Sequence, residues 1–199
     1  MKITYFGHSH FFIEGNEYSI VLDPFKNVGL KEHAVKSDYV FCSHEHFDHN
    51  NASLAIGAKR VLNKFPFEII KSNHDEKGGT LRGKNDILIF MLDGVKLAFL
   101  GDLGEYSNID IINKLNGIDV LLLPVGGKYT INANGAYEYA VKSKAKLIVP
   151  MHYKVPNSNI DIKGVQPFTD KFKNVKMVDG PFEYKNESGV IVITPKQEV

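Results

Sequence analysis

The sequence has a single cysteine and almost no net charge. Cys42 alone rules out a disulfide within the chain and is compatible with a reducing compartment. Lysine and arginine number 24 against 23 aspartate and glutamate residues, which gives a formal charge of +1, and the lysines form no dense block. A polyanionic partner such as a nucleic acid is therefore not expected. We expect a small-molecule substrate.

Long apolar runs are also missing. The strongest run, Val120–Leu123, has the length of a buried strand and is far too short for a membrane span. The chain passes directly from Lys2 into a strand-like segment and shows no apolar signal-peptide core. We expect a cytoplasmic protein without a membrane anchor, and the sequence leaves a homo-oligomer open.

What remains is an ordinary globular composition, with 43% hydrophobic residues over 199 positions, enough for one domain with a sizeable core. Hairpins alternate with helix and strand patterns, which predicts an α/β fold in layers. Helices are expected at Ala52–Ile56, Ile109–Leu115 and Ala133–Lys142. Strands are expected at Lys2–Phe6, Phe11–Glu14, Ser19–Leu22, Tyr39–Ser43, Val61–Asn63, Phe67–Lys71, Ile87–Leu92, Lys96–Leu100, Val120–Leu123, Leu147–Val149, Val175–Val178, Phe182–Tyr184 and Val190–Thr194.

Three segments in the first part of the chain resemble three in the second part, in the same order. The pairs are Tyr18–Asp23 with Lys96–Asp102, Asp38–Phe41 with Asp119–Leu122, and Ala58–Leu62 with Ala145–Val149. Together they predict a single domain over residues 1–199 built from two similar halves, about 1–85 and 86–199. A site between the facing halves would fit this arrangement.

The most informative stretch is His44-Glu45-His46-Phe47-Asp48-His49, which reads H-x-H-x-D-H. It places four metal-competent side chains in six residues, and imidazole and carboxylate suit zinc, iron or manganese. The preceding run is strand-like, so the motif begins where a strand ends, a common place for functional loops. The spacing differs from the H-E-x-x-H zinc helix, whose histidines lie one turn apart. The motif therefore predicts a metal-binding loop.

A two-metal site needs at least one more histidine and a bridging oxygen. His74, Asp102 and His152 each follow a strand-like segment directly, so they can meet at one edge of a sheet. Alone, each could be a turn or surface residue. Beside the H-x-H-x-D-H loop, the three are the expected remaining ligands.

At this point the chain resembles the metallo-β-lactamase-fold hydrolase superfamily, and within it the small metal-dependent hydrolases related to the L-ascorbate 6-phosphate lactonases. The elements that carry the resemblance span nearly the whole chain. In order they are Gly7-His8-Ser9, Leu22-Asp23-Pro24, His44–His49, His74-Asp75 with Arg82–Asn85, Gly101–Gly104, Pro124–Gly127 and Pro150–Lys154.

The resemblance implies a four-layer αβ/βα sandwich with two divalent ions, zinc or alternatively manganese or iron, along one edge. It also implies a division of the ligands. The first metal would be held by His44, His46 and His74. The second would be held by Asp48, His49 and His152, and Asp102 would bridge both ions.

Two divalent ions about 3.5–4 Å apart can share a water and lower its pKa, which makes a metal-bound hydroxide the expected nucleophile. Asp48 is expected to orient this water and shuttle its proton. The predicted function is hydrolysis of a small ester or lactone, with a phosphorylated substrate as one option. The alternatives are a phosphodiesterase or nuclease that acts on a small phosphodiester and a non-catalytic metal-binding sensor.

Other polar residues are candidates for roles around the metals and the substrate. Asp23 and Asp75 are candidates to accept hydrogen bonds from ligand imidazoles. Lys128, Tyr129, Tyr153 and Lys154, with the loop at Gly126 and Gly127, are candidates to hold an anionic substrate group. His8 and His10 form a second H-x-H pair, which is interpreted as pocket or surface residues and not as a third metal site.

Overall fold

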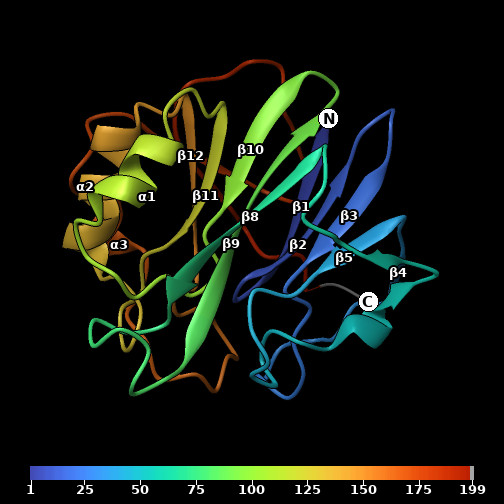
Figure 1. Cartoon of the computed structure of the whole chain (residues 1–199), viewed down its shortest axis with the longest axis horizontal. Coiled ribbons are helices and arrows are strands. Elements are labelled where there is room, and N and C mark those ends of the chain that lie inside the picture. The colour runs from blue at the N-terminus through green and yellow to red at the C-terminus, as the bar shows by residue number, and fades with distance from the viewer. Residues whose placement is uncertain (198–199) are drawn as a thin grey trace.

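Two mixed β-sheets packed face to face form the centre of the molecule, and α-helices cover one outer side (Figure 1). The structure is a computed structural model that describes residues 1–197. Within those residues, no helix combines the length and apolar character needed to cross a bilayer.

The first sheet has six strands. In spatial order they are β14 (Phe182–Glu183), β1 (Lys2–Gly7), β2 (His10–Glu14), β3 (Ser19–Leu22), β5 (Tyr39–Phe41) and β7 (Lys59–Arg60). β2 is antiparallel to both β1 and β3, and β5 is parallel to β3. The strands β1, β3 and β5 therefore run in one direction, and their carboxyl ends meet at one edge.

The second sheet has seven strands. In spatial order they are β13 (Val175–Val178), β15 (Gly189–Ile193), β12 (Leu147–Met151), β11 (Val120–Pro124), β10 (Val95–Phe99), β9 (Lys84–Leu92) and β8 (Phe67–Asn73). β10, β11 and β12 are parallel, and β9 is antiparallel to its neighbours β8 and β10. The expected β9–β10 hairpin is confirmed, with Asp93 and Gly94 both at positive φ in its turn.

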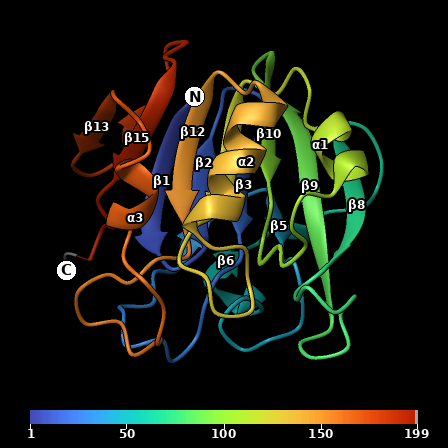
Figure 2. The ribbon, with the colours of Figure 1, turned by 90° about the vertical axis from the view of Figure 1, so that its left-hand side faces the viewer.

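The helices α1 (Ile109–Lys114), α2 (Ala133–Ser143) and α3 (Gln166–Thr169) lie on the outer side of the seven-stranded sheet (Figure 2). α1 begins after Asn108, whose side chain accepts from the backbone N–H groups of Asp110 and Ile111. Asn132 caps α2 in the same way. These N-caps satisfy N–H groups that have no partner within the helix.

The main core fills the space between the sheets. The Phe99 ring of β10 packs edge-on against Phe11 of β2 and Phe41 of β5, with ring centroids 6.5 and 6.3 Å apart. The middle strand β11 is buried along its whole length, as its unbroken apolar sequence requires. Apolar burial between the sheets therefore fixes how the two site-bearing edges face each other.

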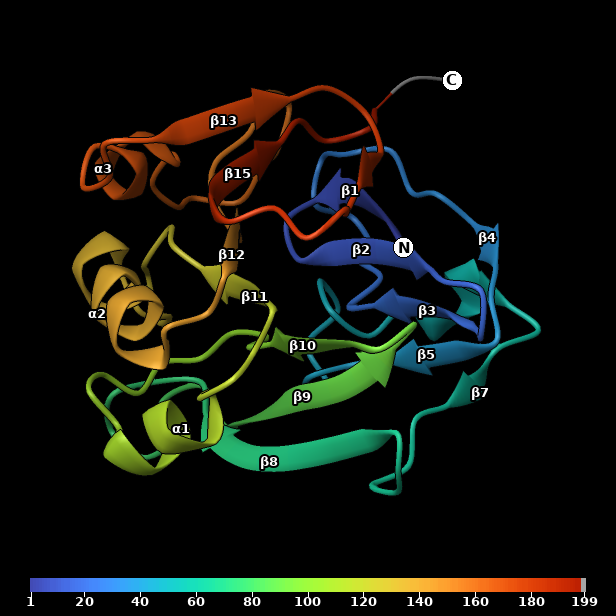
Figure 3. The same ribbon diagram turned by 90° about the horizontal axis from the view of Figure 1, so that it is seen from above.

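The outer face of the six-stranded sheet is covered differently. A 3₁₀ turn, η1 (Ala52–Leu54), and a small sheet of β4 (Val35–Lys36) and β6 (Ala55–Ile56) lie there (Figure 3). Only a small cluster of Val21, Val40 and Ala55 is buried beneath them. The prediction of a helix at Ala52–Ile56 is therefore wrong: Ala52–Leu54 form one 3₁₀ turn, and Ala55–Ile56 form strand β6.

The α/β sandwich expected from the sequence is confirmed, with few helices. The strand expected at Val61–Asn63 is wrong, since the pairing strand β7 lies two residues earlier at Lys59–Arg60. The division into halves near residue 85 stays a prediction. Strand membership does not follow it strictly, because β8 joins the second sheet and β14 joins the first.

Candidate metal centre

Polar side chains gather where strands of both sheets end. In the first sheet, His8 follows β1, Asp23 follows β3, and the H-x-H-x-D-H loop begins three residues after β5. In the second sheet, His74 follows β8, Asp102 comes shortly after β10, and His152 follows β12. The two edges face each other, so the structure brings together all seven side chains predicted as ligands.

One group of imidazoles comes from His44, His46 and His74. Each offers a nitrogen within 4.8 Å of the others, and the rings of His44 and His74 have centroids 4.6 Å apart. His44 and His74 are buried, and His46 is half-buried. This group matches the first metal site expected from the sequence.

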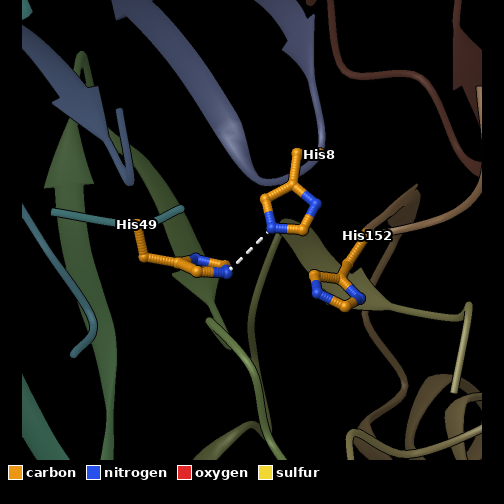
Figure 4. Close-up of side chains that lie close together, drawn as sticks. All are labelled: His8, His49 and His152. Carbon is orange, nitrogen blue, oxygen red and sulfur yellow. Dashed lines mark hydrogen bonds between the residues drawn. The ribbon is translucent and has the colours of Figure 1, made fainter. Parts of the chain in front are cut away.

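A second group consists of His8, His49 and His152, again with ligand nitrogens within 4.8 Å of one another (Figure 4). Asp48 lies beside it, with Oδ2 3.7 Å from His49 Nε2. The expected members His49, His152 and Asp48 are therefore together. His8 is an addition that the sequence interpretation did not place here.

Asp102 lies between the two groups. Its Oδ2 is 3.2 Å from the Nε2 atoms of His74, His49 and His152. Ligands bound to one tetrahedral ion at about 2.1 Å lie about 3.4 Å from each other, so these spacings suit atoms that share a cation. A single carboxylate that reaches both groups is the arrangement a bridging ligand needs.

The orientation of His49 is fixed by Asp23. Asp23 Oδ2 lies 2.7 Å from His49 Nδ1 and also accepts from the Ser43 hydroxyl at 2.6 Å, while its Oδ1 accepts from the Ser43 N–H. A proton on Nδ1 leaves Nε2, which faces Asp102, as the nitrogen of His49 that a cation would bind. The position predicted for Asp23, beside a ligand imidazole, agrees with this contact.

Asp102 is held by the turn that carries it. Its backbone N–H donates to Asn85 Oδ1, and the Asn85 amide donates in turn to the carbonyl of Leu100. Gly101 has φ +52°, and a Cβ there would lie 2.4 Å from Asn85 Oδ1 and 2.5 Å from Ser43 Cβ. Only glycine fits this conformation and this close approach without displacement.

His152 is tied by its backbone to both neighbours. Its N–H donates to the carbonyl of His8 at 2.6 Å, and its own carbonyl accepts from Gly126 N–H at 3.0 Å. The Gly126 N–H is therefore occupied, and the prediction that it holds an anion is wrong. A Cβ on Gly126 would lie 2.2 Å from the His152 carbonyl oxygen, so glycine permits this approach.

The electrostatics favour ligand forms that bind cations. Burial and the nearby His49 lower the pKa of His44 to about 2, and burial and His152 lower the pKa of His8 to about 4. Both rings are thus neutral at pH 7. Burial works against ionisation of Asp102, but His152 and His49 hold its pKa well below the usual range. Neutral imidazoles around an ionised carboxylate are what a divalent metal requires.

His49 differs: burial lowers its pKa, but the carboxylates of Asp102 and Asp23 outweigh burial and raise the pKa well above its ordinary value. Without a cation the ring therefore holds a second proton, on Nε2, and a bound metal would take the place of that proton. Within the described residues, the buried atoms His44 Nε2 and Asp102 Oδ1 find no hydrogen-bond partner. Unpaired buried acceptors are costly, and a bound cation would satisfy them. The residues present therefore fit a metal centre, although their roles as ligands stay predictions.

Comparison with known proteins agrees with this geometry. A family model described as the β-lactamase superfamily domain matches residues 2–152. A Thermotoga maritima crystal structure of the metallo-β-lactamase superfamily is 31% identical, with a TM-score of 0.77 over 96% of this chain and 97% of that chain. The chain belongs to the metallo-β-lactamase superfamily.

Named relatives of this superfamily narrow the enzyme class. An Archaeoglobus fulgidus protein named UPF0173 metal-dependent hydrolase is 28% identical over 77% of this chain and 83% of the relative. A Thermoplasma volcanium protein with the same family name is 26% identical over 100% of this chain and 97% of the relative. The predicted class, a metal-dependent hydrolase of the metallo-β-lactamase superfamily, is confirmed. These names specify no substrate, so the resemblance to the ascorbate 6-phosphate lactonases stays a prediction.

Residues proposed from sequence to contact the substrate differ in position. Lys128 and Tyr129 line the cleft that the predicted metal ligands also line. Tyr153 is buried, and its hydroxyl donates to the carbonyl of Ile193. Lys154 donates to the carbonyls of Ser158 and Ile160. The last two therefore serve the packing of the chain, and Lys154 holds a loop that forms one wall of the cleft.

Asp75 differs from its predicted role. The Asp75 carboxylate accepts four backbone N–H groups from residues 77–82, including that of Arg82 at 2.7 Å. It therefore shapes this loop, and the prediction that it orients an imidazole is wrong. The loop places Arg82 in the cleft, a position that no local sequence pattern indicated.

Proposed function

We propose that this metal-dependent hydrolase acts on a small ester or lactone that carries an anionic group such as a phosphate. The observation that supports it most is the shape of the centre. Asp102, between two groups of imidazoles, lies at the inner wall of a cleft of about 530 Å³. Such a volume suits a small molecule that the cleft encloses in part.

The cleft pairs apolar surface with one well-placed cation. Phe47, 60% exposed, belongs to the H-x-H-x-D-H loop, and Tyr129 also lines the cleft. The Arg82 guanidinium lies 4.7 Å from the centre of the Tyr129 ring. A guanidinium stacked by its face keeps its edge for paired hydrogen bonds to phosphate or carboxylate. Lys128 is paired with Asp161 at 2.5 Å and is the weaker candidate.

Bound divalent cations would supply a water activated near neutral pH and a Lewis acid for the reacting oxygen. The chain supplies the positioning. Asp48 lines the cleft, and its Oδ2 lies 3.2 Å from His8 Nε2. Burial raises the pKa of Asp48, but His8 and His49 outweigh this and hold it below its ordinary value. Asp48 is therefore ionised at neutral pH and can accept a hydrogen bond from the attacking water.

We also propose that the protein acts in the cytoplasm and that its substrate is small. Among residues 1–197, the wall of the cleft carries carboxylates and two side chains with a permanent positive charge, Arg82 and Lys128. A long nucleic acid would need a basic track to neutralise successive phosphates. The cleft thus favours one anionic group on a small molecule.

The test is hydrolysis of a matched panel by protein reconstituted with manganese or zinc, with chelated protein as the blank. The panel contains a sugar-phosphate lactone, the same lactone without phosphate, and a small phosphodiester. Chelator-sensitive opening of the phosphorylated lactone is expected. Cleavage of the phosphodiester alone would move the function to a phosphodiesterase. No turnover with metal bound would support a binding or sensing role.

Arg82→Gln tests the anionic group separately. Loss of a charge-assisted hydrogen bond worth about 1.5–3 kcal/mol should raise KM for the phosphorylated lactone by about tenfold or more. The lactone without phosphate should be affected little. Arg60→Gln is the control, because Arg60 donates to Asn50 away from the cleft lining. An equal change for both lactones would contradict a phosphate-binding role.

A further inference from the structure

His8 is built into the second group of imidazoles although it lies outside the H-x-H-x-D-H motif. Only 2% of it is exposed, and it stands in the left-handed region at φ +55°. Its carbonyl accepts from the Tyr5 hydroxyl at 2.8 Å and from the His152 N–H at 2.6 Å. These bonds fix a backbone conformation that L-residues rarely adopt. The side chain is thereby aimed at His49 (Figure 4).

The atoms that His8 meets are of the kinds that bind metal ions. Its Nε2 lies 3.0 Å from His49 Nε2 and 3.2 Å from Asp48 Oδ2. Because His49 Nδ1 donates to the Asp23 carboxylate, Nε2 is the nitrogen that a cation would bind, in place of a second proton on the ring. Two ring nitrogens and a carboxylate oxygen therefore point into one space. The spacing again suits ligands of a single cation.

We propose that His8 is a ligand of the second metal site. That site then contains the imidazoles of His8, His49 and His152 and the carboxylates of Asp48 and Asp102. This is more than the four ligands of a tetrahedral zinc site and suits a five- or six-coordinate ion such as Mn²⁺ or Fe²⁺. The first site, with His44, His46, His74 and the shared Asp102, keeps fewer protein ligands.

The competing role for His8 is positioning, in which its Nε2–H donates to Asp48 and binds no ion. The two roles differ in a measurable way. A ligand contributes to metal affinity directly, whereas a positioning residue affects turnover while both ions stay bound. The proposal rests on the metal centre of the proposed function and not on its substrate, so metal binding alone tests it.

His8→Gly is the informative variant, because glycine adopts the φ of this position without strain. We expect the second Co²⁺ or Mn²⁺ to bind about 100-fold or more weakly, measured by competition with a chromophoric chelator and by metal analysis after dialysis. The first ion should bind as in the wild type. Added imidazole should restore the second ion, and the absorption of the second Co²⁺ should show lower coordination in the variant.

His33→Gln is the matched control, since His33 stacks on Phe6 away from the centre and should leave both affinities unchanged. Wild-type affinity for both ions in His8→Gly, with turnover alone reduced, would overturn the proposal and leave His8 as a positioning residue. A wild-type protein that binds two ions but hydrolyses no compound of the panel would instead count against the proposed substrate. The two failures are therefore distinguishable.

Discussion

At the scale of single residues, one carboxylate oxygen organises the centre. Asp102 Oδ2 stands 3.2 Å from three imidazole nitrogens supplied by β8, β12 and the H-x-H-x-D-H loop. Around it, Asp23 and Asn85 make no contribution to the cleft lining but hold His49 and the Asp102 backbone. The ligand geometry thus depends on buried neighbours as much as on the ligands.

Asp23→Asn tests this dependence. The variant removes the charge that favours a proton on His49 Nδ1, so His49 loses its fixed tautomer. Partners of this kind change metal affinity by about 10–100-fold, and a loss in that range is expected at the site of His49. Chelator competition measures it. Asp38→Asn, at an exposed carboxylate bonded to Ser19, is the control. Equal affinity in both variants would count against the role of Asp23.

The sequence could predict most of the side chains that gather at the centre because they are either contiguous or placed directly after strands. His8 also directly follows a strand, β1. Its H-x-H spacing, however, suggested His10 as its partner. Its actual neighbours, His49 and His152, lie 41 and 144 positions away along the chain. Arg82 was missed for a related reason, because Asp75 and the loop it shapes decide where its side chain lies.

At the scale of elements, the Gly101 turn allows the edges of the two sheets to approach each other at the centre. The Gly101 turn after β10 brings its backbone against Asn85 and Ser43 of neighbouring segments. The carboxyl end of β5 and the carboxyl end of β10 can approach only because no side chain lies between them. The metal-binding loop and Asp102 therefore share one tight contact.

Gly101→Ala should both destabilise the protein and disturb metal binding. A non-glycine residue in the left-handed region costs about 1–2 kcal/mol, and the Cβ contacts add displacement of Asn85 or Ser43. Gly57→Ala is the matched control, because Gly57 has φ +77° with no atom within 4 Å of its Cβ. Urea unfolding and metal content distinguish the two. Equal losses in both variants would show that only backbone strain matters.

Elements with a strong apolar pattern were predicted well, and those without one were not. β3 matches its expected bounds, and β11 differs by one residue. β7 was placed two residues late because both of its residues are exposed, so burial left no pattern in the sequence. The helix expected at Ala52–Ile56 did not form because this segment buries only Ala55, against Val21 and Val40 of the outer sheet face. Packing against the sheet, and not local helix propensity, therefore determines the conformation of this segment.

At the scale of the whole molecule, the centre joins the two sheets. The six-stranded sheet and its loops supply His8, His44, His46, Asp48 and His49, and the seven-stranded sheet supplies His74, Asp102 and His152. Cations that bind ligands from both sheets bind the folded chain in preference to the unfolded one. Such binding adds to the stability that the apolar core provides.

Chelation should therefore lower the melting temperature. Metal at about 1,000 times its Kd stabilises the fold by about 4 kcal/mol per site, which for a chain of this size corresponds to a shift of about 10 °C. Calorimetry with and without chelator, followed by addition of metal to restore the transition, measures the effect. A melting temperature that chelator leaves unchanged would argue that no ion links the sheets.

The central claim is a two-ion centre bridged by Asp102, and the most direct test is the number of ions bound per chain. Metal analysis after equilibrium dialysis measures the number of bound ions in the wild type and in Asp102→Ala. Hydrolysis of the preferred panel substrate is measured on the same two proteins. The account predicts two ions in the wild type, and a joint loss of metal and hydrolysis in Asp102→Ala. A variant that keeps both ions and full hydrolysis, or a wild-type chain that binds no more than one ion, would contradict it.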